Sequence, residues 1–141
     1  MRPSNEASFL TLFQNYYPNT FLQCDFAEYQ GKDFLVVVCQ QSGFGKVFKT
    51  RNKTSSEAIK AIRNWVSMYG RPTQLRVDAG PAFREGFIEE LRKMGIKVTH
   101  TSAYSPQSNS HAERFVRTLK NILKKCGSNI SQLELDEYIL A

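Results

Sequence analysis

Three acidic residues, Asp25, Asp78 and Glu113, occupy positions from which a carboxylate could do chemistry. Asp25 lies within an extended apolar stretch, where an ionised side chain is unfavourable unless it is paired, hydrogen-bonded or bound to a metal. Asp78 closes a short predicted strand, and Glu113 lies near the first turn of a predicted helix. Each acid also has an ordinary explanation. Asp25 could be an exposed strand residue, Asp78 a helix-capping residue, and Glu113 a carboxylate that complements the helix dipole.

A strand interior, a strand end and a helix start can meet at the same edge of a mixed sheet. Three carboxylates gathered there would suit Mg²⁺ or Mn²⁺, because these ions prefer oxygen ligands and take further ligands from water and substrate phosphates. Two such ions about 3.5–4 Å apart activate an attacking oxygen and stabilise a leaving one. The three acids therefore indicate metal-dependent phosphoryl transfer.

The elements that would position these residues form an α/β pattern. Three extended stretches separated by turn signals predict an antiparallel meander, and two further strands alternate with helices. The expected strands are 21–29, 34–40, 44–50, 74–80 and 96–102, and the expected helices are 55–69, 81–95, 111–126 and 131–141. Thr54 and Glu57 form a capping box before the first of these helices. The order predicts an α/β fold with helices covering a mixed five-stranded sheet.

Composition favours a single folded domain with a basic face. The 141 residues carry a formal net charge of +6, and the apolar runs are far shorter than a membrane span. Positive charge concentrates between residues 114 and 125, which favours a local footprint for a polyanion such as nucleic acid. The three cysteines are odd in number and widely separated. We therefore expect neither a disulfide framework nor a zinc site, and a reducing compartment such as cytosol or nucleus.

Four stretches resemble the catalytic core of retroviral and retrotransposon integrases, most of all those of Ty3/gypsy-like elements. They are CDFAE with Asp25, VDAGPAF with Asp78, YSPQSNSHAER with Glu113, and the following FVRTLK. Between the second and third acids lie 34 residues, positions 79 to 112, which is similar to the spacing of this DDE family. The resemblance spans residues 21 to 125. It implies an RNase H-like fold and a polynucleotidyl transferase whose three acids bind two Mg²⁺ or Mn²⁺ ions.

In this family one site performs both DNA 3′-end processing and strand transfer, so the resemblance implies DNA as the substrate. Glu113, Arg117, Lys120 and Lys124 fall on one helical face, which would set a metal ligand beside phosphate-binding cations. The preceding loop adds polar groups that resemble the DNA-contacting loop of integrases. The expected DNA-binding residues are Tyr104, Gln107, Asn109, Arg114, Arg117, Lys120 and Lys124.

The chain also departs from the family, which commonly has Ser before the second Asp and Asn after it, where Val77 and Ala79 stand here. A weakened or domesticated core that only binds DNA or dimerises is therefore an alternative, and an RNase H-type nuclease is another. We expect residues 1–20 to be an N-terminal extension, and the zinc-binding and C-terminal DNA-binding domains of full integrases to be absent.

Family cores usually form dimers or higher oligomers. We expect the helix at 55–69, with Trp65 exposed, and the last helix to supply the contact surface. The resemblance further implies work in the nucleus, reached through a cytoplasmic integration complex, or in a virus-like particle.

Overall fold

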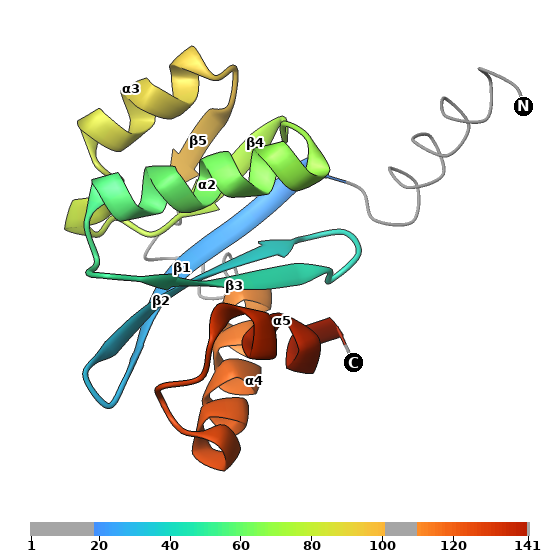
Figure 1. The fold of residues 1–141 in the computed structure, drawn as a ribbon. Coiled ribbons are helices and arrows are strands. Elements are labelled where there is room, and N and C mark those ends of the chain that lie inside the picture. The colour runs from blue at the N-terminus through green and yellow to red at the C-terminus, as the bar shows by residue number, and fades with distance from the viewer. Residues whose placement is uncertain (1–18, 101–109, 141) are drawn as a thin grey trace, which may run out of the picture.

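The computed structural model describes residues 19–100 and 110–140, which form a five-stranded sheet flanked by helices (Figure 1). The strands are β1 (Phe21–Tyr29), β2 (Lys32–Cys39), β3 (Gly45–Thr50), β4 (Gln74–Val77) and β5 (Lys97–His100). Their order across the sheet is β3-β2-β1-β4-β5. The first three strands pair antiparallel, whereas β4 runs parallel to both β1 and β5. The predicted mixed five-stranded sheet is confirmed.

The helices form two layers on opposite faces of the sheet. One face carries α2 (Ser55–Tyr69), the short 3-10 helix η1 (Pro81–Phe83) and α3 (Glu85–Lys93); the other carries α4 (Ser110–Cys126) and α5 (Gln132–Leu140) (Figure 1). Among the described residues, none of the helices combines the length and the apolar character that a membrane span requires.

A tight hairpin fixes the register of the central strand β1. Gln30 and Gly31 have φ angles of +50° and +77°, as a two-residue hairpin turn with left-handed central residues requires, and Tyr29 pairs with Lys32 across it. Because side chains alternate along a strand, Leu22 and Cys24 face α2 and α3, whereas Gln23, Asp25 and Ala27 face α4. The hairpin thus decides on which face the first acid lies.

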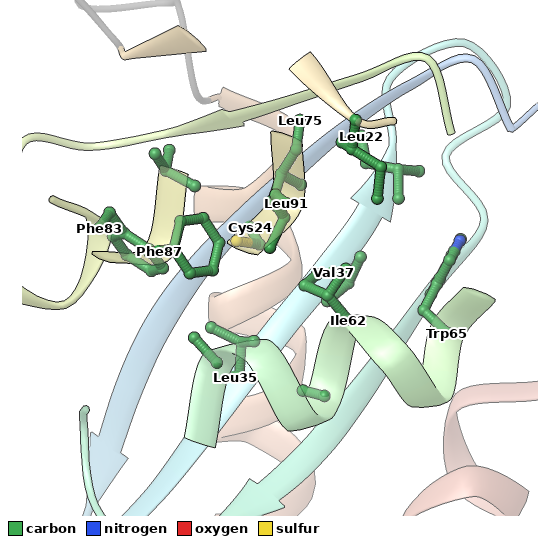
Figure 2. Close-up of a cluster of buried hydrophobic side chains, with 14 of the residues drawn as sticks. Leu22, Cys24, Leu35, Val37, Ile62, Trp65, Leu75, Phe83, Phe87 and Leu91 are labelled. Atoms are coloured by element: carbon green, nitrogen blue, oxygen red, sulfur yellow. The ribbon is translucent and has the colours of Figure 1, made fainter. Parts of the chain in front are cut away.

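Each face of the sheet has its own apolar core. The larger core packs Leu22, Cys24 and Leu75 against α2 and α3 (Figure 2). The smaller one packs Val36 and Val38 of β2 against Leu119 and Leu123 of α4. The central strands are therefore buried on both sides, which holds them rigidly.

Three details differ from the sequence-based expectations. Trp65 is not exposed but 1% accessible, and its indole N–H donates to Asn19 Oδ1 at 2.8 Å. The predicted helix at 81–95 is broken at Arg84, whose extended backbone separates η1 from α3. Only half of the capping box forms, because the Glu57 carboxylate accepts from the Arg51 N–H while Thr54 accepts from the Glu57 N–H.

Candidate active site

Asp25 is held half-buried in the middle of β1, on the face that α4 covers. Burial raises the pKa of its carboxyl from 3.8 to about 6, with smaller contributions from the negative charges of Asp78 and Glu113. The Phe26 N–H and the Lys53 ammonium act in the opposite direction. The three predicted acids therefore lie close enough together for two of them to disfavour ionisation of the third.

Asp78 follows the last residue of β4 and reaches this region through parallel pairing. Gln23 lies opposite Arg76 in the β1–β4 register, and continuing that register by two residues sets Asp25 level with Asp78. The Asp78 side chain is fixed by a local turn in which its Oδ1 accepts from the Gly80 N–H at 2.8 Å. Because this hydrogen bond occupies Oδ1, Oδ2 is the oxygen more available to bind a metal ion.

Glu113 projects from the first turn of α4 and is exposed. The start of this helix lies against β1, since the Ala112 N–H donates to the Gln23 side-chain oxygen at 3.2 Å. Ala112 is fully buried, so the backbone immediately before Glu113 is anchored in the protein interior. One strand thus carries Asp25 and also contacts the helix turn that carries Glu113.

The donor set has the chemistry of a hard-cation site. Its candidate ligands are carboxylate oxygens, and the nearby Cys24 thiol points into the opposite core with a pKa raised by burial. Within residues 19–100 and 110–140, no three acidic, His or Cys side chains are already gathered closely enough to hold a metal. The residues fit a magnesium-type ion in kind and neighbourhood, and a bound cation would favour the ionised form of Asp25 against the burial and the repulsion that raise its pKa.

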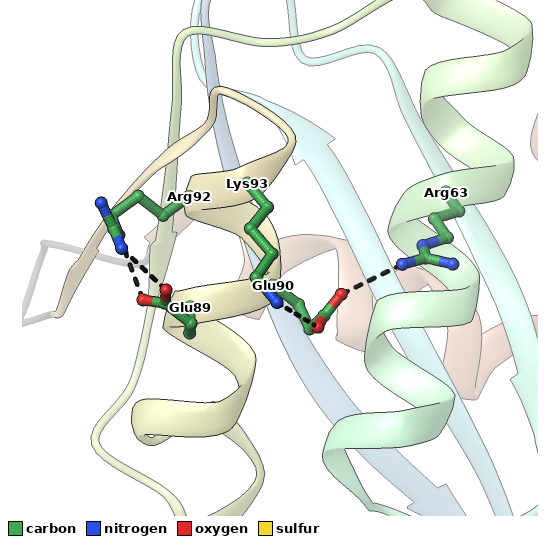
Figure 3. A network of polar contacts seen from close by, with 5 residues as sticks. All are labelled: Arg63, Glu89, Glu90, Arg92 and Lys93. Carbon is green, nitrogen blue, oxygen red and sulfur yellow. Dashed lines mark hydrogen bonds and ion pairs between the residues drawn. The ribbon is translucent and has the colours of Figure 1, made fainter.

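The outer face of α4 is cationic. Arg114, Arg117, Lys120 and Lys124 are all exposed, and none forms an ion pair with another described residue. The opposite layer differs: Arg63 pairs with Glu90 at 3.1 Å, and α3 carries two further ion pairs (Figure 3). No described acid therefore neutralises these four cations, and their role as DNA contacts stays a prediction.

Comparison with known proteins places these features in a family. No protein-family model matches the chain. The Gag-Pro-Pol polyprotein of human T-cell leukemia virus 2 is 32% identical over 127 residues, covering 86% of this chain and 9% of the polyprotein. The chain therefore spans a small part of that relative's length.

Two solved integrase cores share the fold. The catalytic core domain of BIV integrase has a TM-score of 0.73 at 25% identity, over 86% of this chain and 82% of that one. The HTLV-2 integrase catalytic core domain in complex with magnesium, in a trimeric form, has a TM-score of 0.67 at 28% identity, over 87% and 81%. The chain belongs to the retroviral integrase catalytic cores. Its fold is accordingly RNase H-like.

In this integrase core, two residues beside the acids were not among the predicted site residues. Lys53 lies between β3 and α2, forms an ion pair with Glu28 at 2.9 Å, and lowers the pKa of Asp25. Gln23 is a polar residue buried at 1% exposure two positions before Asp25. The only sequence signal for Gln23 was an amide side chain in an otherwise apolar strand, and Lys53 had none.

Three predicted DNA contacts cannot be placed. Tyr104, Gln107 and Asn109 lie outside the described residues, so their role as DNA contacts stays a prediction. The remaining four predicted contacts lie on α4.

Proposed function

We propose that this integrase core is a DDE polynucleotidyl transferase that carries out DNA 3′-end processing and strand transfer. The single observation that carries the proposal is the parallel register of β1 and β4, which sets Asp25 level with Asp78. The pKa of Asp25, raised by burial and by the charges of Asp78 and Glu113, agrees with this placement. Perturbed carboxylates of this kind are typical of functional sites. The family membership supplies the reaction class.

In the proposed reaction, Asp25, Asp78 and Glu113 hold two Mg²⁺ or Mn²⁺ ions. When bound, such ions would activate the attacking oxygen and stabilise the leaving oxygen of an in-line displacement. The magnesium-bound HTLV-2 core supports this choice of metal. The chain's own contribution would be to carry the three carboxylates on rigid elements at one region of the sheet, with Asp78 oriented by the Gly80 N–H.

The same site would use two attacking groups in succession. Water first releases the terminal nucleotides of the element DNA, and the freed 3′-hydroxyl then attacks a phosphodiester of the target DNA. Arg114, Arg117, Lys120 and Lys124 would bind the phosphate backbone, because they are exposed on the helix that carries Glu113 and form no ion pair with a described residue. Tyr104, Gln107 and Asn109, which precede α4 in the sequence, would contribute further contacts.

The proposed assembly is a homodimer or higher oligomer. The HTLV-2 core occurs in trimeric and dimeric forms, which supports this proposal. Here the edge strand β3, α2 and α5 surround a cleft of about 400 Å³, and Met68 in its lining is 47% exposed. Exposed apolar residues of α5, including Leu133 at 70%, extend this surface. We propose that this surface, formed by β3, α2 and α5, is where two copies of the chain meet. Trp65 is buried and so does not belong to it.

The domain and its setting complete the proposal. Residues 1–141 would form one catalytic core domain, with 1–20 as an N-terminal extension, and it would act on nuclear DNA or within a virus-like particle. Relatives encoded as retroviral Pol polyproteins support a viral or element origin.

The experiment is a nicking assay on supercoiled plasmid with Mn²⁺. Asp78→Asn and Glu113→Gln should abolish nicking while circular dichroism shows an intact fold, and Glu137→Gln, an exposed acid on α5, should leave it unchanged. Wild-type protein that binds DNA in a salt-sensitive way but never nicks it would favour the silent binding module instead. Cleavage of RNA:DNA hybrids without action on duplex DNA would favour an RNase H-type nuclease.

A further inference from the structure

We propose that Gln23 is a positioning residue: its side chain fixes the first turn of α4 against β1 and thereby holds Glu113 in place for a metal shared with Asp25. The inference rests on the proposed function, because it concerns how that same site is assembled. It assigns a role to a residue that touches neither substrate nor metal.

The first observation is a hydrogen-bonded amide in the protein interior. Gln23 is 1% exposed, its Oε1 accepts from the Ala112 N–H at 3.2 Å, and its Nε2 donates to Gln40 Oε1 at 3.3 Å. A buried amide is unfavourable unless its polar atoms are satisfied, and these two bonds satisfy it. Gln23 therefore has a specific structural reason to lie where it does.

The second observation is the identity of the donor. Ala112 is in the first turn of α4, which begins at Ser110, and the first four N–H groups of a helix have no acceptor within the helix. Ala112 is also fully buried, so water cannot replace a missing acceptor there. The Gln23 oxygen supplies that acceptor from 89 residues away in the sequence.

The third observation is the placement of both partners relative to the acids. Gln23 and Asp25 are two residues apart on β1 and so lie on the same face of the central strand. Ala112 immediately precedes Glu113. The hydrogen bond therefore links the strand that holds one acid to the helix turn that holds another, and its loss would let the start of α4 shift away from Asp25.

The test is a Mn²⁺ titration by calorimetry on wild type, Gln23→Met, Glu113→Gln and the double variant. Methionine keeps the length of the side chain and removes the acceptor. Gln23→Met should weaken Mn²⁺ binding about tenfold or more, the range typical for residues that orient metal ligands. In the Glu113→Gln background the same change should have no further effect, because Gln23 acts through Glu113.

A matched control is Gln40→Met, which removes the other partner of Gln23 but leaves the bond to Ala112. It should bind Mn²⁺ within about twofold of wild type, well inside the effect expected for Gln23. Amide hydrogen exchange gives an independent readout without metal: the Ala112 N–H should be protected in wild type and exchange rapidly in Gln23→Met.

Two results would overturn the inference. One is a folded Gln23→Met protein with unchanged Mn²⁺ affinity, or with an equal loss in the presence and absence of Glu113. The other, which needs no variant that might fail to fold, is rapid exchange of Ala112 in wild type. If wild type instead shows no Glu113-dependent Mn²⁺ binding while Ala112 is protected, the proposed function fails although the anchoring contact exists.

Discussion

Replacing Asp25 with Asn is expected to stabilise the protein at neutral and alkaline pH. The pKa of Asp25 is raised from 3.8 to about 6 by burial and by neighbouring acids, so the folded state retains a proton that the unfolded chain has already released. The free energy of unfolding contributed by this group therefore falls as pH rises from about 4 to about 6, and it stays low above that window. Asparagine has nearly the same shape but carries no charge, so Asp25→Asn avoids this loss in the free energy of unfolding.

The size of the effect follows from the difference between the two pKa values. A carboxyl that titrates about two pH units higher in the folded state costs roughly 3 kcal/mol once ionised in both states. Because Asp25 is only half-buried, water reduces this, and we expect Asp25→Asn to gain about 2 kcal/mol at pH 8. At pH 3.5, where the carboxyl is mostly protonated, the two proteins should be equally stable.

Urea unfolding followed by circular dichroism at pH 3.5, 6 and 8, with EDTA present to exclude divalent metal, measures this directly. Glu137→Gln removes an exposed acid of α5 and controls for the change in net charge. An Asp25→Asn protein that is no more stable than wild type at pH 8, or a gain that does not depend on pH, would refute the reasoning.

Other perturbations test neighbouring parts of the site. Gly80→Ala would set a Cβ 2.9 Å from Asp78 Oδ1 and push the carboxylate aside; calorimetry should show Mn²⁺ binding weakened about tenfold, and unchanged affinity would mean that this orientation is unimportant. Arg117→Ala with Lys120→Ala should reduce the slope of log DNA affinity against log salt by about 2, measured by fluorescence anisotropy, and an unchanged slope would exclude α4 as the DNA face. Met68→Glu should shift sedimentation toward monomer, and an unaltered oligomer would move the self-contact surface elsewhere.

Local patterns were enough to predict most of the fold. An aromatic-rich stretch, a turn signal and a β-branched run predicted the hairpin of β1 and β2, and the helical spacing of apolar residues predicted α4, because these signals depend on neighbouring residues. The break at Arg84 was missed, since an early Pro and a late Gly are equally compatible with one helix or with a 3-10 turn followed by another.

Those parts of the site that depend on tertiary contacts could not be predicted from the sequence. Asp25, Asp78 and Glu113 were recognised from motifs, but that β1 and β4 run parallel and level is visible only in the structure. Trp65 was expected outside because helix patterns do not reveal which side covers the sheet; it packs in the core and donates to Asn19. Gln23 makes its contact with Ala112 across 89 residues, and no local pattern encodes such a pair.

The most direct test of the triad is a crystal soaked in Mn²⁺, with diffraction data collected at the manganese absorption edge. We expect anomalous density between Asp25, Asp78 and Glu113, with all three carboxylates turned toward it. A well-ordered crystal with no such density, or with Mn²⁺ bound while one of the three points away, would contradict the assignment of these acids as the metal-binding centre.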